Sequence, residues 1–459
     1  MPDLRPSSPR SSAAGRRPRV SGEASTVAKL LEGLRTITTV ERRGRLVEAI
    51  GTTLKVTGID ARIGQACEIV EPATGQSIPA EVIGIAGQAA ILTPLADVRG
   101  LSVDAEVIVR SGEDRIPYGP ALLGRVLDGR GLPIDGFGPI ADTLPRRPLH
   151  APAPQPMERA LIDTPMETGV RAIDTLLTVG AGQRMGVFAA AGGGKSTLLG
   201  MLARFCVADV IVIALIGERG REVREFIEDN LGPEGLARSV IVCATSDRPA
   251  MERVRAAHHA TAIAEGFREE GKRVLLLMDS VTRFARALRE IGLAAGEPAV
   301  RRGFPPSVFA ELPRLFERAG TDAQGSITGI YTVLLEDEEG GDPVGEEVRS
   351  ILDGHIVLSR KLGAAGHYPA IDVLGSLSRV FPRLAAADHR AAAQRVRALM
   401  AKYAEIEFLV QVGEYKPGSD PLADKAIAAR PEIDALLRQD ADTAEPFATS
   451  LMLLQGAGA

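Results

Sequence analysis

The spacing of hydrophobic and polar positions changes several times along the chain, and each change predicts a different kind of structure. The segment TVAKLLEGLRTI, from residue 27, has apolar residues at helical spacing. Between residues 37 and 110 the pattern switches to short apolar runs separated by Gly, Pro and Asp, namely GRLVEAI, TTLKVTGI, CEIVE, AEVIGI, AAILTPL and AEVIVR. Short strands with turn signals between them predict a small all-β barrel.

The remaining chain predicts a larger α/β domain followed by helices. Residues 111–155 are rich in Gly and Pro and are predicted to connect two domains. From about residue 156, apolar strands alternate with amphipathic helices, which indicates a mostly parallel sheet. The predicted organisation is a disordered basic tail (1–26), a helix and β-barrel (27–110), a connecting segment (111–155), an α/β domain (156–384) and a helical domain (385–459).

The stretch AAAGGGKSTLL, residues 189–199, differs by one residue from the phosphate-binding pattern G-x-x-x-x-G-K-[ST], because Ala189 stands at the first glycine. It lies between a predicted strand and a predicted helix, where backbone N–H groups and the helix dipole meet phosphates. Three glycines precede Lys195, where the backbone must approach the phosphates or adopt a positive φ. An incidental Gly-rich turn is the plainer alternative. The predicted nucleotide-binding residues are Ala191, Gly192, Gly193, Gly194, Lys195, Ser196 and Thr197, with the Ser196 hydroxyl on Mg²⁺.

Two further apolar runs end in carboxylates that suit ATP hydrolysis. RVLLLMD ends in Asp279, which can order the Mg²⁺ shell, and VIVIALIGE ends in Glu218, which can orient or deprotonate the attacking water. The carboxyl ends of parallel strands meet at one edge of a sheet, so these groups are expected beside the phosphate loop. For Glu218, a surface salt bridge among Glu218, Arg219, Arg221 and Glu222 is the alternative.

Composition narrows the possible functions. The chain of 459 residues carries a formal net charge of −5 at pH 7, has no Trp, and contains only 4% aromatic residues. This charge gives no overall attraction to polyanions, and so few rings make a base-stacking surface difficult to build, so no nucleic acid partner is expected. Cys67, Cys206 and Cys243 lack metal-ligand spacing and are predicted to be reduced core residues of a cytoplasmic protein. The sequence has neither a secretory-signal pattern at its start nor an apolar run long enough to cross a membrane.

Five longer stretches carry a specific resemblance: GERGRE, MDSVTRFARALREIGLAAGEP, RRGFPPSVFAELPRLFERAG, RSILDGHIVLSRKL and GHYPAIDVLGSLSR. Through them the chain closely resembles the type III secretion ATPases, the export motors of injectisomes and flagella, which are relatives of the catalytic subunits of rotary ATP synthases. The resemblance runs from about residue 30 to the C-terminus and is densest between 160 and 385. It implies a RecA-like P-loop domain, and in that family the first P-loop position is often Ala.

The resemblance also implies an assembly and a set of site residues. It implies a homohexameric ring, joined partly through the β-barrel domain, with ATP sites between neighbouring subunits. Glu218 is implied as the catalytic carboxylate, and Arg219 and Arg283 as cations at the phosphates. Arg379 matches the arginine finger that reaches a neighbour's γ-phosphate, and Tyr368 matches the ring that stacks on adenine. A helix-surface cation, a packing ring and a structural ion pair are the plainer interpretations of Arg283, Tyr368 and Arg379.

The partners implied by the resemblance belong to a secretion apparatus. The acidic loop at 336–347 and the RRGFPP loop correspond to segments that face a central channel, where a coiled-coil stalk protein inserts. The N-terminal region is implied to bind a stator or regulator protein, and the helices of 386–459 to receive chaperone–effector complexes. Chaperone release, unfolding of cargo and transfer to an export gate would then take place at the cytoplasmic face of the inner membrane.

Four other functions share some of these features. An RNA translocase of the Rho type would need stacking rings in its barrel, but residues 37–110 contain no Phe, Tyr or Trp. A non-hydrolysing ring subunit would typically replace the carboxylate at Glu218. A rotary ATP synthase subunit is disfavoured because SRVFPRL and LLEDEEGGDP resemble export ATPases. Between export systems, TRFARALRE, AAAGGGKS and GGDPVGEEVRSILDGH resemble injectisome enzymes more than flagellar ones.

Overall fold

The structure is a computed structural model that describes residues 42–110, 112, 114–190, 192–335 and 341–458. The predicted tail of 1–26, the helix predicted from residue 27 and the nucleotide-binding residue Ala191 therefore lie outside the described residues. Within the described part, no helix is both long and apolar enough to cross a membrane.

The N-terminal domain is a closed six-stranded barrel, as the short apolar runs separated by turn residues predicted. Its strands follow the order β1-β2-β5-β4-β3-β6, with every neighbouring pair antiparallel. Alternate residues such as Leu54 and Val56 fill the interior, because successive side chains of a strand point to opposite faces. The strands are β1 (Arg43–Ile50), β2 (Thr53–Thr57), β3 (Ala66–Val70), β4 (Ser77–Ala86), β5 (Ala89–Pro94) and β6 (Glu106–Val109).

The segment after the barrel, 111–155, does more than connect two domains. It contains a short turn, η1 (Pro120–Leu122), and a ribbon formed by β7 (Arg115–Pro117) and β9 (Arg146–Pro148). Its strand β8 (Val126–Asp128) pairs in parallel with β12 and becomes an edge strand of the main sheet. Part of the predicted connection thus belongs to the central domain.

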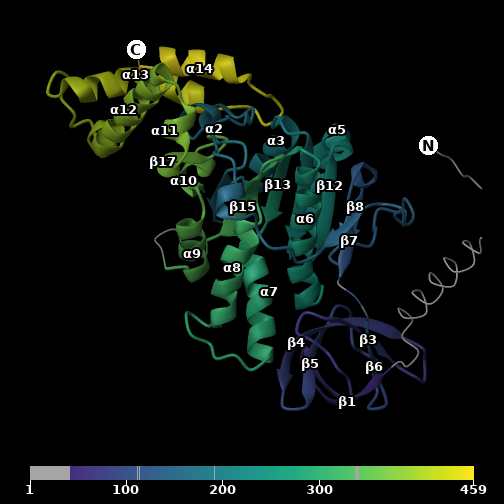
Figure 1. Cartoon of the computed structure of the whole chain (residues 1–459). Coiled ribbons are helices and arrows are strands. Elements are labelled where there is room, and N and C mark those ends of the chain that lie inside the picture. The colour runs from purple at the N-terminus through teal and green to yellow at the C-terminus, as the bar shows by residue number, and fades with distance from the viewer. Residues whose placement is uncertain (1–41, 111, 113, 191, 336–340, 459) are drawn as a thin grey trace, which may run out of the picture.

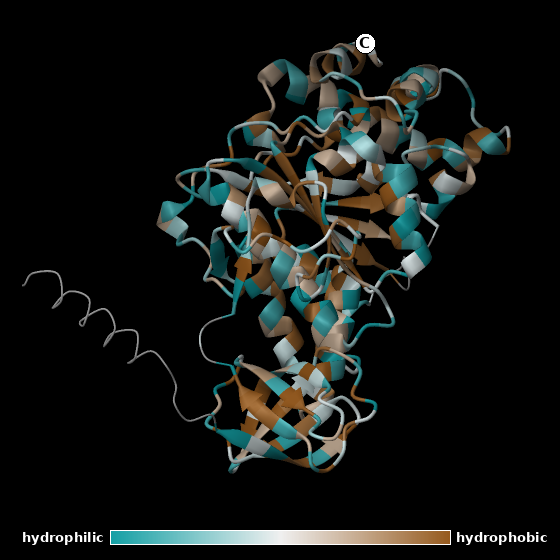
Figure 2. Cartoon of the chain, turned by 90° about the vertical axis from the view of Figure 1, so that its right-hand side faces the viewer, coloured by the Kyte–Doolittle hydropathy of each residue, from teal (hydrophilic) through white to brown (hydrophobic). Residues whose placement is uncertain are grey.

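The central domain is built on one mostly parallel sheet with the strand order β17-β16-β10-β15-β13-β11-β12-β8. Among the described strands of this sheet, only β17 and the short β14 pair antiparallel. Figure 2 shows these strands as a largely hydrophobic layer inside the molecule. The strands are β10 (Arg184–Ala189), β11 (Val210–Ile216), β12 (Ser239–Ala244), β13 (Arg273–Asp279), β14 (Gly320–Thr321), β15 (Ser326–Leu334), β16 (Gly354–Leu358) and β17 (Ile371–Ser378).

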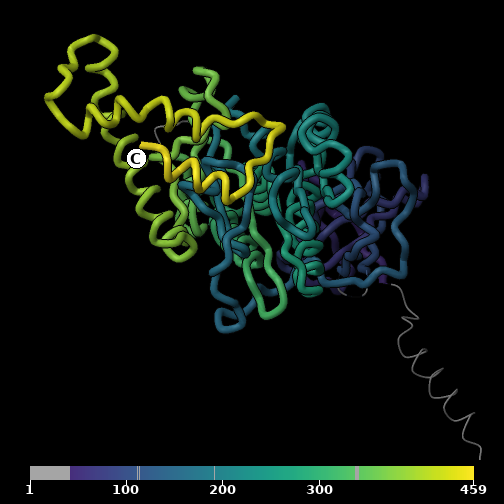
Figure 3. Tube along the Cα trace, turned by 90° about the horizontal axis from the view of Figure 1, so that it is seen from above, coloured from purple at the N-terminus to yellow at the C-terminus, as the bar shows by residue number. Residues whose placement is uncertain are grey.

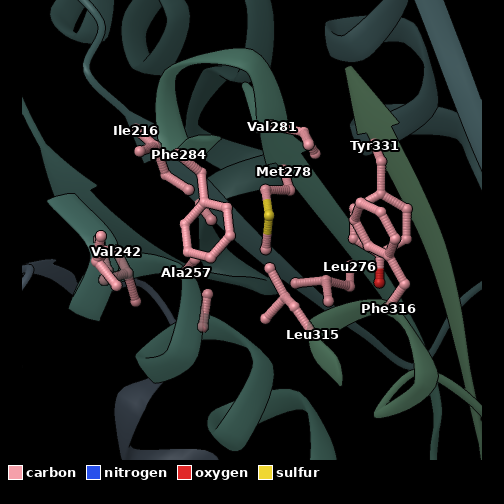
Figure 4. Close-up of a cluster of buried hydrophobic side chains, with 14 of the residues drawn as sticks. Ile216, Val242, Ala257, Leu276, Met278, Val281, Phe284, Leu315, Phe316 and Tyr331 are labelled. Carbon is pink, nitrogen blue, oxygen red and sulfur yellow. The ribbon is translucent and has the colours of Figure 1, made fainter. Parts of the chain in front are cut away.

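Helices cover both faces of this sheet, and β11 shows why. Its sequence VIVIALI is apolar throughout, so alternate residues enter a hydrophobic core on each face. One core includes α6, α7, α8 and α9, and part of it is shown in Figure 4. The other core includes α2 and α3. The helices and turns of this domain are η2 (Pro156–Glu158), α2 (Arg171–Leu176), α3 (Lys195–Phe205), α4 (Gly220–Glu225), the π-helical turn η3 (Phe226–Leu231), α5 (Gly232–Ala237), α6 (Ala250–Glu269), α7 (Val281–Ala294), α8 (Pro306–Glu317), α9 (Pro343–Ile351), α10 (Arg360–Ala364) and α11 (Phe381–Leu384).

The C-terminal helices α12 (Ala387–Gln411), α13 (Pro421–Leu437) and α14 (Phe447–Gly456) lie at the end of the molecule opposite the barrel (Figure 1). Viewed from that end, they lie over the central domain (Figure 3). Val396, Ile433 and Leu454 enter the same core as α2 and α3, so the helical region packs onto the central domain and shares its core. The predicted fold class is confirmed: a barrel, a central P-loop domain and a helical C-terminal region.

The three cysteines are free and buried, which confirms their prediction as core residues.

Candidate nucleotide site

The predicted site residues Lys195, Glu218 and Asp279 follow three parallel strands and meet at the carboxyl edge of the sheet. Lys195 begins α3 after β10, Glu218 follows β11, and Asp279 ends β13. The parallel pairing of β10, β15, β13 and β11 brings these strand ends together.

The loop after β10 has the backbone that a phosphate cradle requires. Gly192 and Gly194 have φ angles of 81° and 77°, in the left-handed region that favours glycine. Ala189 is fully buried as the last residue of β10, so its methyl group fits extended backbone and the missing first glycine costs nothing. Ser196 and Thr197 are exposed in the first turn of α3, whose N-terminal N–H groups suit an anion.

Opposite charges meet directly beside this loop. The Lys195 ammonium lies 2.5 Å from Asp279 Oδ1 and 3.3 Å from Glu218 Oε1. Arg283, from the first turn of α7, contacts the same Glu218 oxygen. Arg283 is therefore not a free cation on the helix surface, because it makes this contact and its side chain is only 25% exposed. Two cations therefore fix the position of the Glu218 carboxylate.

Arg219 lies next to Glu218 in sequence, but its guanidinium points elsewhere. Its side chain is 75% exposed and pairs with Glu222 at 3.2 Å. This pair is part of the surface salt bridge given above as the alternative interpretation of Glu218. A hydrogen bond with Glu218, followed by the positive charges of Arg219 and Arg283, lowers the pKa of Glu222. Contact of Arg219 with the phosphates stays a prediction.

Asp279 has a second partner that sequence reasoning missed. The Thr332 hydroxyl donates to Asp279 Oδ1 at 2.7 Å, and Thr332 is fully buried on β15, between β10 and β13. No periodicity or motif in the sequence signals this contact, because 53 residues separate the two side chains.

The oxygen donors beside the loop fit Mg²⁺ bound together with a nucleotide. Within the described residues, no group of three or more His, Cys, Asp or Glu could hold a metal by itself. The Ser196 hydroxyl and the Asp279 carboxylate are hard oxygen donors, and Mg²⁺ normally takes its remaining ligands from phosphates and water.

A pocket of about 750 Å³ opens beside the phosphate loop, and Tyr368 lies on its wall. A Cβ atom added at Gly194 would lie 3.2 Å from the Tyr368 ring, which places this ring against the loop. The far wall comes from the turn between α13 and α14, including Arg438, Gln439 and Thr443. The Gln439 N–H donates to the Tyr368 carbonyl at 2.9 Å, so the helical region is tied to the ring. Sequence reasoning did not identify this C-terminal wall, since nothing in it resembles a binding motif.

Arg379 lies at the amino ends of the parallel strands, whereas Lys195, Glu218 and Asp279 lie at their carboxyl ends. Its N–H donates to the Asp353 carbonyl, and the Asp353 N–H donates to the carbonyl of Arg184, the first residue of β10. The phosphate loop follows the last residue of that strand, so Arg379 lies a strand length, about 17 Å, away along the strand direction. The exposed Arg379 guanidinium donates to the Arg349 carbonyl at 3.4 Å, and it cannot reach the nucleotide site of its own chain.

The two loops expected at a central channel touch each other. Arg301, from the RRGFPP loop, pairs with Glu346 at 2.6 Å in the acidic segment. Residues 336–340 of the acidic loop lie outside the described residues. A role for either loop in binding a stalk stays a prediction.

Two models of known protein families match the chain. The model of the ATP synthase alpha/beta family, nucleotide-binding domain, matches residues 169–378. The model of the T3SS EscN ATPase C-terminal domain matches residues 385–456.

Two relatives and two solved structures match nearly the whole chain. The chain is 58% identical to a type 3 secretion system ATPase of Xanthomonas euvesicatoria over 92% of its length and 95% of the relative. It is 50% identical to a flagellum-specific ATP synthase of Salmonella typhimurium over 87% of its length and 90% of the relative. The structure of the assembled ATPase EscN from enteropathogenic E. coli matches with a TM-score of 0.86 and 49% identity, covering 91% of this chain and 100% of that one. EscN in complex with its central stalk EscO matches with a TM-score of 0.83 and 48% identity, at the same coverage.

Proposed function

The chain belongs to the type 3 secretion system ATPases, within the ATP synthase alpha/beta family, and from this membership we propose how its residues hydrolyse ATP and what the hydrolysis serves. The observation that carries the proposal is the cluster of Lys195, Glu218 and Asp279 beside the phosphate loop. A cation and two carboxylates that follow neighbouring buried strands are the parts that phosphoryl transfer to water requires.

Each residue of the cluster has a separate task in this mechanism. Lys195 places its charge on the β and γ oxygens, and the backbone N–H groups of residues 192–194 hold the phosphates. Glu218 orients the attacking water and accepts its proton, while Arg283 keeps the carboxylate in place. Ser196 and Asp279 would hold Mg²⁺ together with the phosphates, and the bound ion would supply positive charge to the phosphate oxygens. Tyr368 stacks on the adenine at the pocket wall.

Arg379 completes the site of a neighbouring subunit in this proposal. Its place at the opposite edge of the sheet is what a head-to-tail ring requires, because one face of each subunit must supply the finger and the other the phosphate loop. The relative EscN has been solved as an assembled ATPase, and this supports a ring of six copies for this chain. An arginine supplied in trans stabilises the transition state only after the neighbour docks, so assembly and turnover are coupled.

Hydrolysis in this ring serves protein secretion at the cytoplasmic face of the inner membrane. EscN binds a central stalk, EscO, and a coiled-coil stalk in the channel of this ring follows by analogy. The C-terminal helices are proposed to receive chaperone–effector complexes, whose chaperones are released and whose cargo is unfolded and passed to the export gate. A stator or regulator protein is proposed to bind the N-terminal region.

The test is ATPase activity measured against protein concentration for wild type and Arg379→Ala. Wild-type activity per subunit should rise steeply as rings form, and Arg379→Ala should stay at the low level of the dilute protein at every concentration. Arg383→Ala, an exposed arginine of α11 close by in the sequence, is the matched control and should behave like wild type. Activity that is independent of concentration and indifferent to Arg379 would remove both the ring and the finger from the proposal.

A further inference from the structure

Thr332 lies on the strand between the two strands that lead to the phosphate loop and to Asp279. The strand β15 lies between β10, which leads to the phosphate loop, and β13, which ends in Asp279. Thr332 pairs with Val187 on the β10 side, and on the β13 side its predecessor Tyr331 pairs with Met278. Thr332 is therefore level with Asp279 in the sheet, and its hydroxyl reaches that carboxylate.

The contacts of Asp279 divide its two oxygens between different tasks. Oδ1 accepts from the Thr332 hydroxyl at 2.7 Å and lies 2.5 Å from the Lys195 ammonium. Both of these contacts are made by Oδ1, and neither involves Oδ2. A carboxylate whose first oxygen is held by the strand presents its second oxygen in a fixed direction, which is what a metal shell requires of a ligand or of a water acceptor.

The proposed function makes the Thr332 contact more important than the Lys195 contact. Lys195 must direct its charge to the phosphates once a nucleotide binds, which weakens its hold on Asp279. The Thr332 hydroxyl has no such second task at the site, because its other acceptor within reach is the Met278 carbonyl at 3.3 Å. The plainer interpretation is that the Thr332 hydroxyl donates only to the Met278 carbonyl. The shorter distance to Asp279 favours donation to the carboxylate.

We propose that Thr332 is a positioning residue that aims Asp279 at the Mg²⁺ shell and thereby sets how strongly Mg²⁺ and nucleotide bind together. This inference rests on the proposed function, which assigns Asp279 to Mg²⁺. Thr332 itself touches neither nucleotide nor metal, so its effect must pass through the direction of the Asp279 carboxylate.

The test compares three substitutions on full-length protein. Thr332→Val keeps the shape of the side chain and removes the hydroxyl, and Thr332→Ser restores it. Thr328→Val is the matched control: Thr328 lies on the same strand, is 2% exposed, and its hydroxyl accepts from the Gly182 N–H at 2.8 Å, away from the site. Both valine variants leave a buried polar group without its partner, so both should lower the thermal unfolding temperature.

The decisive measurement is the dissociation constant of a fluorescent ADP analogue, with excess Mg²⁺ and with EDTA. For wild type, Mg²⁺ should tighten binding. In Thr332→Val this gain should fall by about tenfold, as expected for a group that orients a metal ligand, while binding in EDTA should stay unchanged. Thr332→Ser should regain most of the Mg²⁺ effect, and Thr328→Val should keep all of it despite its lower stability.

A fourth variant, Asp279→Asn, separates failure of this inference from failure of the proposed function. If Asp279→Asn loses the Mg²⁺ gain and Thr332→Val keeps it, Asp279 belongs to the metal site and the inference on Thr332 is overturned. Equal weakening of Thr332→Val in Mg²⁺ and in EDTA also overturns it, because that is the result of general distortion. If Asp279→Asn keeps the full gain, the assignment of Asp279 in the proposed function is wrong, and the inference falls with it.

Discussion

Glu218 is fixed by two cations, and this contact decides what its replacement should do. The carboxylate meets Lys195 at 3.3 Å and touches Arg283 as well, on a residue that is 7% exposed. A neutral amide of the same shape would keep the packing and the phosphate loop intact. It could not accept the proton of the attacking water.

We expect Glu218→Gln to lower kcat by about 10²- to 10⁴-fold, the usual contribution of a general base, and to leave ATP binding within about twofold of wild type. Steady-state turnover and equilibrium nucleotide binding measure the two effects separately. Glu225→Gln is the control, since Glu225 lies seven residues further along the chain and pairs with Arg221 at the surface. Unchanged hydrolysis in Glu218→Gln would show that another group activates the water.

The site residues that were predicted from the sequence are those that a single short segment is enough to indicate. Lys195 and Ser196 belong to a contiguous loop, and Glu218 and Asp279 each end a single apolar strand. Thr332 and Gln439 were missed because each acts through a residue far away in the chain. A buried threonine in a strand has the same local sequence whether its hydroxyl donates to a backbone carbonyl or to a carboxylate beside the phosphate loop.

At the scale of elements, the helix that begins with the phosphate loop is held by an unusually close contact. Gly200 of α3 faces the π-helical turn η3, and a Cβ atom at Gly200 would lie 2.8 Å from Asn230 Cβ and 2.9 Å from the Asn230 carbonyl oxygen. The carbonyl is backbone and cannot rotate away, so only glycine allows this approach. The position of Lys195 and Ser196 depends on it.

Gly200→Ala should therefore destabilise the protein by about 1–2 kcal/mol, even though alanine normally favours a helix interior over glycine by about 1 kcal/mol. Denaturant unfolding measures the change, and weaker nucleotide binding should accompany it because α3 shifts. Gly456→Ala, at an exposed position at the end of α14 with no atom within 4 Å of the added Cβ, should be neutral or stabilising. Equal stability of both variants would contradict the close packing.

Helix α6 adds a pH dependence to stability because its histidines are buried. Burial and the nearby Arg255 cation lower the pKa of His259 to about 4. The folded protein then binds fewer protons than the unfolded chain between pH 4 and about 6.5, so the unfolding free energy falls as pH drops through that window. Above pH 6.5 His259 is neutral in both states and has no such effect.

In His259→Gln, the slope of unfolding free energy against pH between 4.5 and 6 should decrease by the contribution of one proton, up to about 1.4 kcal/mol per pH unit. Urea unfolding at several pH values gives this slope, and the values at pH 8 correct for any change in packing. His150 and His258, whose pKa values are also lowered, should leave a residual slope. Parallel curves for wild type and variant would mean that His259 is protonated in the folded state.

Strands with a clear apolar run could be predicted from the sequence. A short strand that is defined only by its pairing could not. All six barrel strands were predicted from short apolar runs separated by turn residues, and one face of each strand fills the interior. Strand β8 has three residues in a Gly- and Pro-rich segment, and only its pairing with β12 makes it a strand. Such a strand has no periodicity to detect.

At the scale of the whole molecule, Glu218 and Arg379 lie at opposite edges of the same sheet. In the head-to-tail ring proposed above, Glu218 of one subunit would meet Arg379 of the next at every interface. Glu218→Gln and Arg379→Ala damage opposite sides of that interface. Each variant alone should have little activity.

Mixing the two inactive variants should restore activity. At equal amounts, about a quarter of the interfaces pair an intact Glu218 with an intact Arg379, if subunits mix at random in a heterologous ring. Recovery towards about a quarter of wild-type turnover is expected after dissociation and reassembly, measured as phosphate release. Two preparations of the same variant, mixed in the same way, are the control. No recovery despite mixed rings would show that Arg379 does not complete the Glu218 site of a neighbouring subunit.

The C-terminal helices share a core with the central domain and build one wall of the pocket beside Tyr368. This arrangement limits how such proteins can diverge or be recombined. A segment that contributes Val396 and Leu454 to a common interior and Gln439 to a binding wall cannot be exchanged between relatives as an independent cassette. A chimera that takes 385–456 from another secretion system would also bring a foreign wall to this pocket, so the outward faces of these helices are the part that can change most freely.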